Sequence, residues 1–204
     1  MTTIPAIQAS EVNLQTAKIL EAFSAVNAKI NTILSKISFF ALILILVGCN
    51  SVKEISILET KEIKINVNTV LNDWHLAASE ANFETYFSKM DSISVFIGTD
   101  ATENWNKEQF KAYSKPYFDK GKAWSFTTLE RNIYVNNLGN FVWFDELLNT
   151  QMGTCRGSGV LEKKGNSWKI KHYVLSITIP NEDVNAVIKA KKKNDDLFLK
   201  KFKK

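Results

Sequence analysis

Cysteine, histidine and arginine are scarce in this sequence of 204 residues, which contains only two of each. The two cysteines, Cys49 and Cys155, are too few for a disulfide framework, and two histidines exclude a histidine-rich metal centre. The sequence also lacks a glycine-rich phosphate loop, a zinc-ligand spacing, a Ser-His-Asp motif and a dinucleotide fingerprint. We therefore expect neither a metal nor a cofactor.

Positive charge is gathered at the C-terminus. The net charge is +5, but eight lysines and two aspartates between Ala186 and Lys204 give that segment +6, so the other 185 residues sum to −1. A nucleic-acid-binding domain should carry its positive charge on a folded face. We therefore expect no nucleic acid partner. A hydrophobic content of 45% instead indicates one globular domain with appendages.

An apolar run of 11 residues, Ile37–Val47, follows Lys36 and precedes Gly48-Cys49. It is shorter than the roughly 20 residues that span a bilayer as a helix, and it has the length of a signal-peptide core. Leu46 to Cys49 resembles the lipobox of bacterial lipoproteins, in which a small residue precedes the lipidated cysteine. The sequence therefore predicts membrane attachment through lipidated Cys49 and a location in the bacterial cell envelope, periplasmic or surface-facing.

Two alternatives bear on this signal. The run could instead be a buried apolar helix or strand that happens to contain a cysteine. About 35 residues precede Lys36, so either the start lies too far upstream or a cytoplasmic helix precedes the signal, and we favour the first.

If Cys49 is lipidated, the mature chain has 156 residues and one thiol, Cys155, which we expect to be structural. The expected organisation is a signal region (1–48), a tether (49–65), a domain (66–182) and a basic tail (183–204).

Hydrophobic spacing predicts three helices in the first half of the domain. Apolar residues recur at helical intervals over 67–78 and again over 83–90. A β-rich segment follows at 91–100. A capping-box pattern formed by Asn106 and Gln109 begins a third helix, which should end near Lys120, before Gly121.

Four long strand patterns fill the rest of the domain, at 123–135, 141–152, 154–163 and 167–179, with turn signals between them. The apolar parity slips within the first pattern, which predicts a β-bulge near Glu130 to Asn132. We expect four aromatic residues to be largely buried: Trp74, Phe96, Trp143 and Trp168.

Helices followed by a strand meander indicate an α+β domain. This order resembles the nuclear transport factor 2-like and ketosteroid-isomerase-like fold, and several short motifs resemble its SnoaL-like branch. The resemblance covers about 115 residues, from Val67 to Glu182. The matching segments are 95–100 with Glu103 and Trp105, 142–144 with Glu146, 156–163, 168–173, 175–176 and 180–182. It implies a cone in which three N-terminal helices pack on a bent antiparallel sheet, with a pocket at the open end.

Pockets of this kind are lined by the first helix, the segment after the first strand and the concave face of the last strands. Carried over by position, the resemblance assigns nine candidate pocket residues: Trp74, Asp100, Trp105, Tyr117, Trp143, Glu146, Arg156, His172 and Ser176. A carboxylate or histidine there could act as a general base, and a Tyr, Trp or Arg could stabilise an oxyanion. No catalytic residue is assigned.

Each polar candidate also has a structural interpretation. Asp100 could cap a turn, and Glu146 could pair with Arg156 across neighbouring strands. His172 shares the strand parity of Ile170 and Val174, so it could be a satisfied core residue. We nevertheless expect Arg156 and His172 to reach the cavity.

Three functions remain open at this point. The first is a membrane-tethered domain that binds a small apolar or carbonyl-bearing molecule. The second is an enzyme, either a ketosteroid-isomerase-like isomerase or a cyclase or dehydratase. The third is an interaction module that forms a homodimer through the outer sheet face. The tail could extend as a helix before its lysines, either solvated or lying against anionic lipid or polysaccharide.

Overall fold

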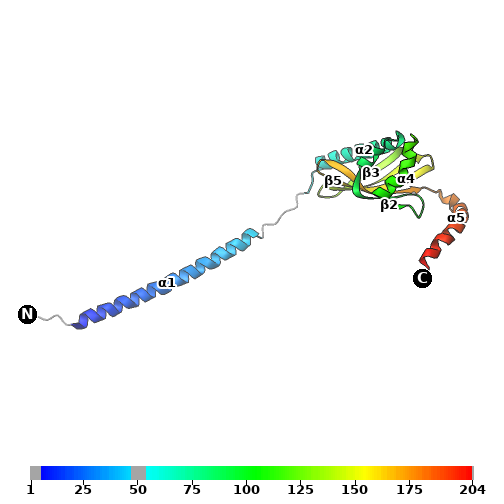
Figure 1. Cartoon of the computed structure of the whole chain (residues 1–204). Coiled ribbons are helices and arrows are strands. Elements are labelled where there is room, and N and C mark those ends of the chain that lie inside the picture. Colours follow the sequence, from blue (N-terminus) through cyan, green and yellow to red (C-terminus); the bar gives the residue numbers. More distant parts are fainter. Residues whose placement is uncertain (1–5, 47–53, 204) are drawn as a thin grey trace, which may run out of the picture. The chain divides into compact units, whose positions relative to one another are not determined.

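A computed structural model of the chain describes residues 6–46 and 54–203. These residues belong to two compact units, 1–52 and 53–204. The described part of the first unit is one helix, α1 (Ala6–Leu46), which contains most of the apolar run (Figure 1). None of the helices described could cross a membrane, because each lacks a sufficiently long apolar stretch. Cys49 lies outside the described residues, so its lipidation stays a prediction.

The domain begins earlier than expected, because residues 57–65 are helical and not a tether. Helix α2 (Ile57–Ser79) starts with a capping box. The Glu59 backbone N–H donates to Ser56 Oγ at 3.2 Å, and the Ser56 N–H donates to Glu59 Oε2 at 2.8 Å. The buried face of α2 starts at Ile63 and continues through Val67 and Leu71.

Two shorter helices complete the helical layer, α3 (Phe83–Ser88) and α4 (Lys107–Asp119). Helix α4 begins with the predicted capping box, in which Asn106 and Gln109 exchange two hydrogen bonds of 3.0 Å. It ends before Gly121, whose φ of +72° lies in the left-handed region that glycine tolerates best. The predicted third helix is therefore confirmed.

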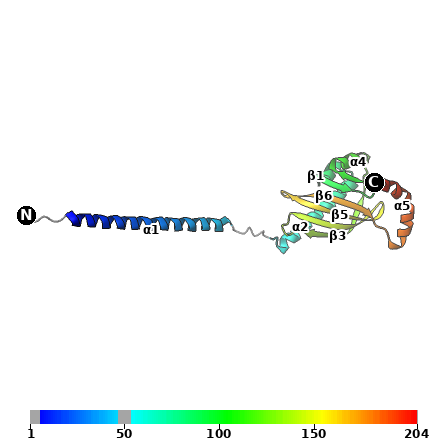
Figure 2. The same cartoon turned by 90° about the horizontal axis from the view of Figure 1, so that it is seen from below.

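A six-stranded sheet forms the other layer, with the order β2-β1-β6-β5-β4-β3 (Figure 2). Its strands are β1 (Met90–Ile97), β2 (Asn104–Asn106), β3 (Phe126–Val135), β4 (Phe141–Thr150), β5 (Gly153–Lys164) and β6 (Ser167–Ile177). Strands β3 to β6 form the predicted antiparallel meander. The sheet as a whole is mixed and not antiparallel, because β1 pairs with β6 in parallel.

Two of the three register shifts in the sheet decide which side chains of β3 and β6 face the helices. The register of β3 and β4 shifts between Thr128 and Glu130, next to the predicted position. A second shift lies in the pairing of β5 with β6. Val160 pairs with His172 and the next residue, Leu161, pairs with Ile170, so β6 has one extra residue between the two pairs. The extra residue reverses the alternation along β6, because side chains alternate between faces with a period of two. Ile170 and Tyr173 are therefore both buried, and His172 does not share the face of Ile170.

Three of the four aromatic residues expected in the core are buried: Trp74, Phe96 and Trp168. Trp143 is the exception, with 50% of its surface exposed. The alternation along β4 buries Val142 and Phe144, which leaves Trp143 on the opposite, outer face, where its ring stacks on Tyr134 at 5.8 Å. Parity along one strand could not decide between the faces, because apolar residues occupy both.

The C-terminal segment is helical along most of its length, including the lysine-rich part. After η1 (Asn181–Asp183), helix α5 (Val184–Leu199) continues through the first lysine block, and η2 (Lys200–Phe202) follows. Helix α5 is labelled near the C-terminus in Figure 1, and none of its residues is buried. The tail is therefore a helix with an uncovered surface.

Candidate functional site

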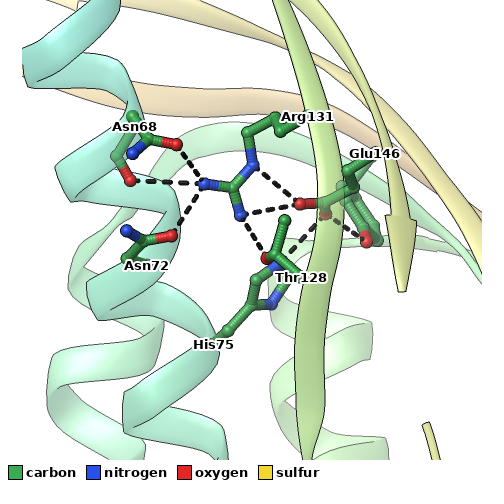
Figure 3. Close-up of polar contacts among 7 residues, drawn as sticks. Asn68, Asn72, His75, Thr128, Arg131 and Glu146 are labelled. Atoms are coloured by element: carbon green, nitrogen blue, oxygen red, sulfur yellow. Dashed lines mark hydrogen bonds and ion pairs between the residues drawn. The ribbon is translucent and has the colours of Figure 1, made fainter. Parts of the chain in front are cut away.

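Glu146 on β4 lies at the centre of a buried polar cluster and is fully excluded from solvent. Its Oε1 accepts a hydrogen bond from the Tyr173 hydroxyl at 2.9 Å and lies 2.9 Å from His75 Nε2. Its Oε2 is 2.9 Å from Arg131 Nε and 2.7 Å from Arg131 Nη2 (Figure 3). Both carboxylate oxygens are therefore fully engaged.

Arg131 ties this carboxylate to helix α2. Its Nη1 donates to Asn68 Oδ1 at 2.6 Å and to Asn72 Oδ1 at 2.8 Å, and its Nη2 donates to Thr128 Oγ1 at 2.9 Å (Figure 3). Each of the three guanidinium nitrogens thus donates to an acceptor, although the side chain is only 3% exposed. A buried charge is tolerated when it is paired and hydrogen-bonded in this way.

The electrostatics of the cluster agree with this pairing. Burial by itself would raise the pKa of the Glu146 carboxyl, but His75 and Arg131 outweigh it and hold the pKa below the ordinary value of 4.5. Burial and then the Glu146 charge raise the pKa of the Tyr173 phenol well above 10.0. The cluster therefore holds an ionised carboxylate and a neutral phenol at neutral pH.

Gly157 on β5 leaves room for the cluster. A Cβ atom at this position would lie 2.3 Å from the Tyr173 hydroxyl and 2.9 Å from Glu146 Oε1. The Gly157-Ser158-Gly159 sequence therefore has a packing role here, because the glycine lets a tyrosine and a carboxylate meet over the strand.

A cavity of about 140 Å³ opens at the end of the sheet where β1 and β6 finish and β3 begins. Its walls are mainly aromatic and aliphatic, with a few polar groups. The lining residues are Phe96, Gly98, Thr99, Glu103, Trp105, Phe110, Tyr113, Trp124, Phe126, Gln151, Met152 and Leu175.

One aromatic layer separates this cavity from the polar cluster. Phe126 lines the cavity and packs edge-on against the His75 ring at 5.7 Å. Phe96 also lines it and stacks on Tyr173 at 5.5 Å. The groups that could transfer a proton in the cluster thus lie behind the cavity wall and not on it.

The predicted site residues fall into three places. Trp105 lines the cavity, and Tyr117 and Asp100 lie near it without lining it: Tyr117 packs against Tyr113 at 5.6 Å, and Asp100 caps the turn after β1. Trp74 and Glu146 are in the interior. The other four alternate with buried neighbours and so face away from the helices, on the outer face of the sheet: Trp143, Arg156, His172 and Ser176.

Strand register explains why Arg156 and His172 do not reach the cavity. Glu146 faces Gly157 on β5 and Arg131 on β3, whereas Arg156 faces Leu147. The carboxylate does pair across the sheet, but with the other arginine. The bulge in β6 likewise turns His172 outward and brings Tyr173 inward.

Sequence reasoning missed His75, Arg131 and Tyr173 in the cluster, and Glu103 and Tyr113 at the cavity. Two of these had a readable signal. Arg131 shares the parity of Ile133 and Val135 beyond the observed register shift at Thr128 to Glu130, and His75 follows Leu71 by four residues on the buried stripe of α2.

Comparisons with known proteins agree with this architecture. The sequence model of the SnoaL-like domain matches residues 67–180, more than half of the chain. No curated protein sequence matches. A candidate dehydratase of the nuclear transport factor 2-like family from Streptomyces avermitilis is 10% identical over 59% of this chain and 99% of its own, with a TM-score of 0.51. A candidate aromatic ring hydroxylase from Novosphingobium aromaticivorans is 9% identical over 58% and 91%, with a TM-score of 0.50. At these identities the structures share the fold alone.

Proposed function

This chain belongs to the SnoaL-like domain family, and on that premise we propose that its domain binds a small apolar molecule in the cavity at the ends of β1 and β6. The observation that carries the proposal is the aromatic cavity of about 140 Å³. An apolar cavity of about 150 Å³ binds benzene, so this one suits a ligand with a single ring. Because the cavity is open, a substituent on the ring can extend toward solvent.

Binding without catalysis fits the residues better than an isomerase or lyase reaction. A general base must reach the substrate, directly or through one water. Glu146 and His75 are instead bonded to each other behind Phe126, and Arg156 and His172 lie outside the cavity. Among the residues described, Glu103 is the one carboxylate on the cavity wall, and its Oε2 accepts from the Asp100 N–H at 3.1 Å. The other groups that an enzyme of this fold would need are engaged in the core or placed elsewhere.

Titration with benzyl alcohol, followed by amide chemical shifts in NMR spectra, tests the proposal. We expect perturbed amides around 98–113 and 151–152, which flank the cavity. Trp105→Ala should weaken binding roughly fivefold, because an aromatic contact contributes about 1 kcal/mol. Trp143→Ala, on the outer face, is the matched control and should leave the affinity unchanged. The proposal fails if no amide shifts at millimolar ligand, or if the shifts lie on the outer face.

A specific observation favours dimerisation as a second function of the same domain. Trp143, Tyr134 and Phe141 are exposed together at one end of the outer sheet face, and exposed apolar patches often mark interaction sites. We expect Trp143→Lys to convert a dimer into a monomer in sedimentation equilibrium. If the wild-type protein sediments as a monomer at about 100 µM, dimerisation is refuted.

Membrane attachment is proposed from the sequence signal alone. The apolar run before Gly48-Cys49 supports lipidation of Cys49 in a bacterial envelope, and two or more acyl chains give stable attachment where one is marginal. Cys49→Ser should release the protein from the membrane fraction or leave an unprocessed precursor. A Cys49→Ser protein that partitions into detergent and migrates like the wild type would refute lipidation.

A further inference from the structure

We propose that the cavity selects small organic cations, such as a ring that carries an ammonium group, over neutral and anionic ligands of the same shape. This inference rests on the proposed function, since it needs the cavity to bind a ligand. It concerns the chemical class of that ligand, which the family match leaves open.

Aromatic rings form a continuous wall of the cavity. Trp105 stacks on Tyr113 at 4.3 Å and on Phe110 at 5.7 Å, and Phe110 stacks on Phe96 at 3.9 Å. Aromatic rings attract a cation held over the ring face within about 6 Å of the centroid. Because these rings stack on one another, a cation in the cavity contacts the ring surface that the stack leaves open.

Glu103 is the one lining residue with a formal charge. In the part of the chain that the structure describes, no lysine or arginine forms a salt bridge with it, unlike Glu146. The cavity therefore presents a carboxylate beside aromatic walls, and no lysine or arginine among the described residues lines it. A ligand ammonium group supplies the missing partner, whereas a ligand carboxylate meets a like charge.

The backbone holds the Glu103 carboxylate in place. The Asp100 N–H donates to Glu103 Oε2 at 3.1 Å, and the Gly98 N–H donates to the Glu103 carbonyl at 2.9 Å. Any side chain at residue 98 would collide with this carboxylate, because a Cβ atom there would lie 2.1 Å from Oε2. The tight turn after β1 thus positions a negative charge at the cavity wall before a ligand arrives.

Tyr113 adds no charge of its own to the cavity. Burial, and to a lesser extent Tyr117 and the Glu103 charge, raise the pKa of its phenol to about 12. The phenol therefore stays neutral at physiological pH. Asp100, on the same turn, carries a second negative charge, and its pKa is lowered by hydrogen bonds from Thr102 and, to a lesser extent, by the charge of Lys201.

Three ligands of similar shape but different charge show whether charge affects binding: benzylammonium, benzyl alcohol and benzoate. Each is titrated into the full chain and followed by amide chemical shifts. We expect benzylammonium to bind roughly tenfold more tightly than benzyl alcohol, and benzoate to bind more weakly than both.

Glu103→Gln removes the charge and keeps an oxygen that can accept from the Asp100 N–H. In this variant we expect the affinities for benzylammonium and benzyl alcohol to agree within about twofold. Glu108→Gln is the matched control, because Glu108 is a nearby exposed glutamate on α4 that does not line the cavity. It should keep the wild-type preference.

The outcomes distinguish this inference from the proposed function. If benzyl alcohol binds in the cavity but benzylammonium binds no better, the cavity is a ligand site without charge selection and the inference is wrong. The same conclusion follows if Glu103→Gln keeps the full preference. If none of the three ligands binds, the proposed function itself fails.

Discussion

Replacing Arg131 with methionine removes the guanidinium that pairs with Glu146 and keeps an unbranched apolar side chain in its place. The pair is almost fully buried, with the arginine 3% and the glutamate 0% exposed. The variant leaves Glu146 Oε2 without its donor while Oε1 keeps His75 and Tyr173. Breaking a buried pair in this way costs about 3–5 kcal/mol, because an uncompensated charge stays in the core.

Urea unfolding, followed by tryptophan fluorescence and circular dichroism, measures this loss. In a thermal melt, at roughly 3 °C per kcal/mol for a domain of this size, the Tm should fall by about 10–15 °C. The sequence offers a matched control in its other arginine, Arg156, which is exposed on the outer sheet face. Arg156→Met should change the free energy of unfolding by less than about 0.5 kcal/mol.

A double-mutant cycle tests the mechanism behind the number. Glu146→Leu alone should also be costly, because it leaves Arg131, His75 and Tyr173 without their acceptor. Combining it with Arg131→Met removes both charges, so the double variant should lose at least about 2 kcal/mol less than the two single losses added together. Additive losses, or equal effects of Arg131→Met and Arg156→Met, would refute the argument that this buried pair stabilises the fold.

Two further predictions follow from burial and charge. Trp168→Ala should cost about 3–5 kcal/mol in thermal or urea unfolding, whereas Trp143→Ala should cost less than about 1 kcal/mol, and equal losses would contradict the assignment of Trp143 to the outer face. Because the folded-state pKa of Glu146 is lowered, its contribution to stability is present above pH 4.5 and is lost as the pH falls through the folded-state pKa. The Tm of Glu146→Gln should therefore fall less steeply than that of the wild type between pH 7 and pH 3, and parallel curves would contradict this.

Local signals in the sequence determined much of the secondary structure. The capping box of Asn106 and Gln109 and the glycine after α4 act within a few residues, so they can be read without the fold. The same holds for the turns between the last four strands and for the slip of parity that marks the bulge in β3. The capping box at Ser56 was equally local, and reading it would have placed the start of α2 at Ile57.

The tertiary structure alone decided which polar groups meet. Glu146 has arginines on both neighbouring strands, and only the register shows that Arg131 faces it while Arg156 faces Leu147. The approach of His75 depends on how α2 lies across the sheet, which joins residues 71 positions apart in the sequence. The pairing of β1 with β6 is likewise long-range, and it makes the sheet mixed.

One extra residue in β6 had the largest effect on the predicted site. Because strand side chains alternate with a period of two, a single inserted residue sends every following side chain to the other face. The sequence determined that a histidine and a tyrosine stand side by side at 172 and 173. The pairing of β5 with β6 decided that Tyr173 enters the core and bonds Glu146 while His172 faces outward, because strand pairing fixes where the extra residue is accommodated.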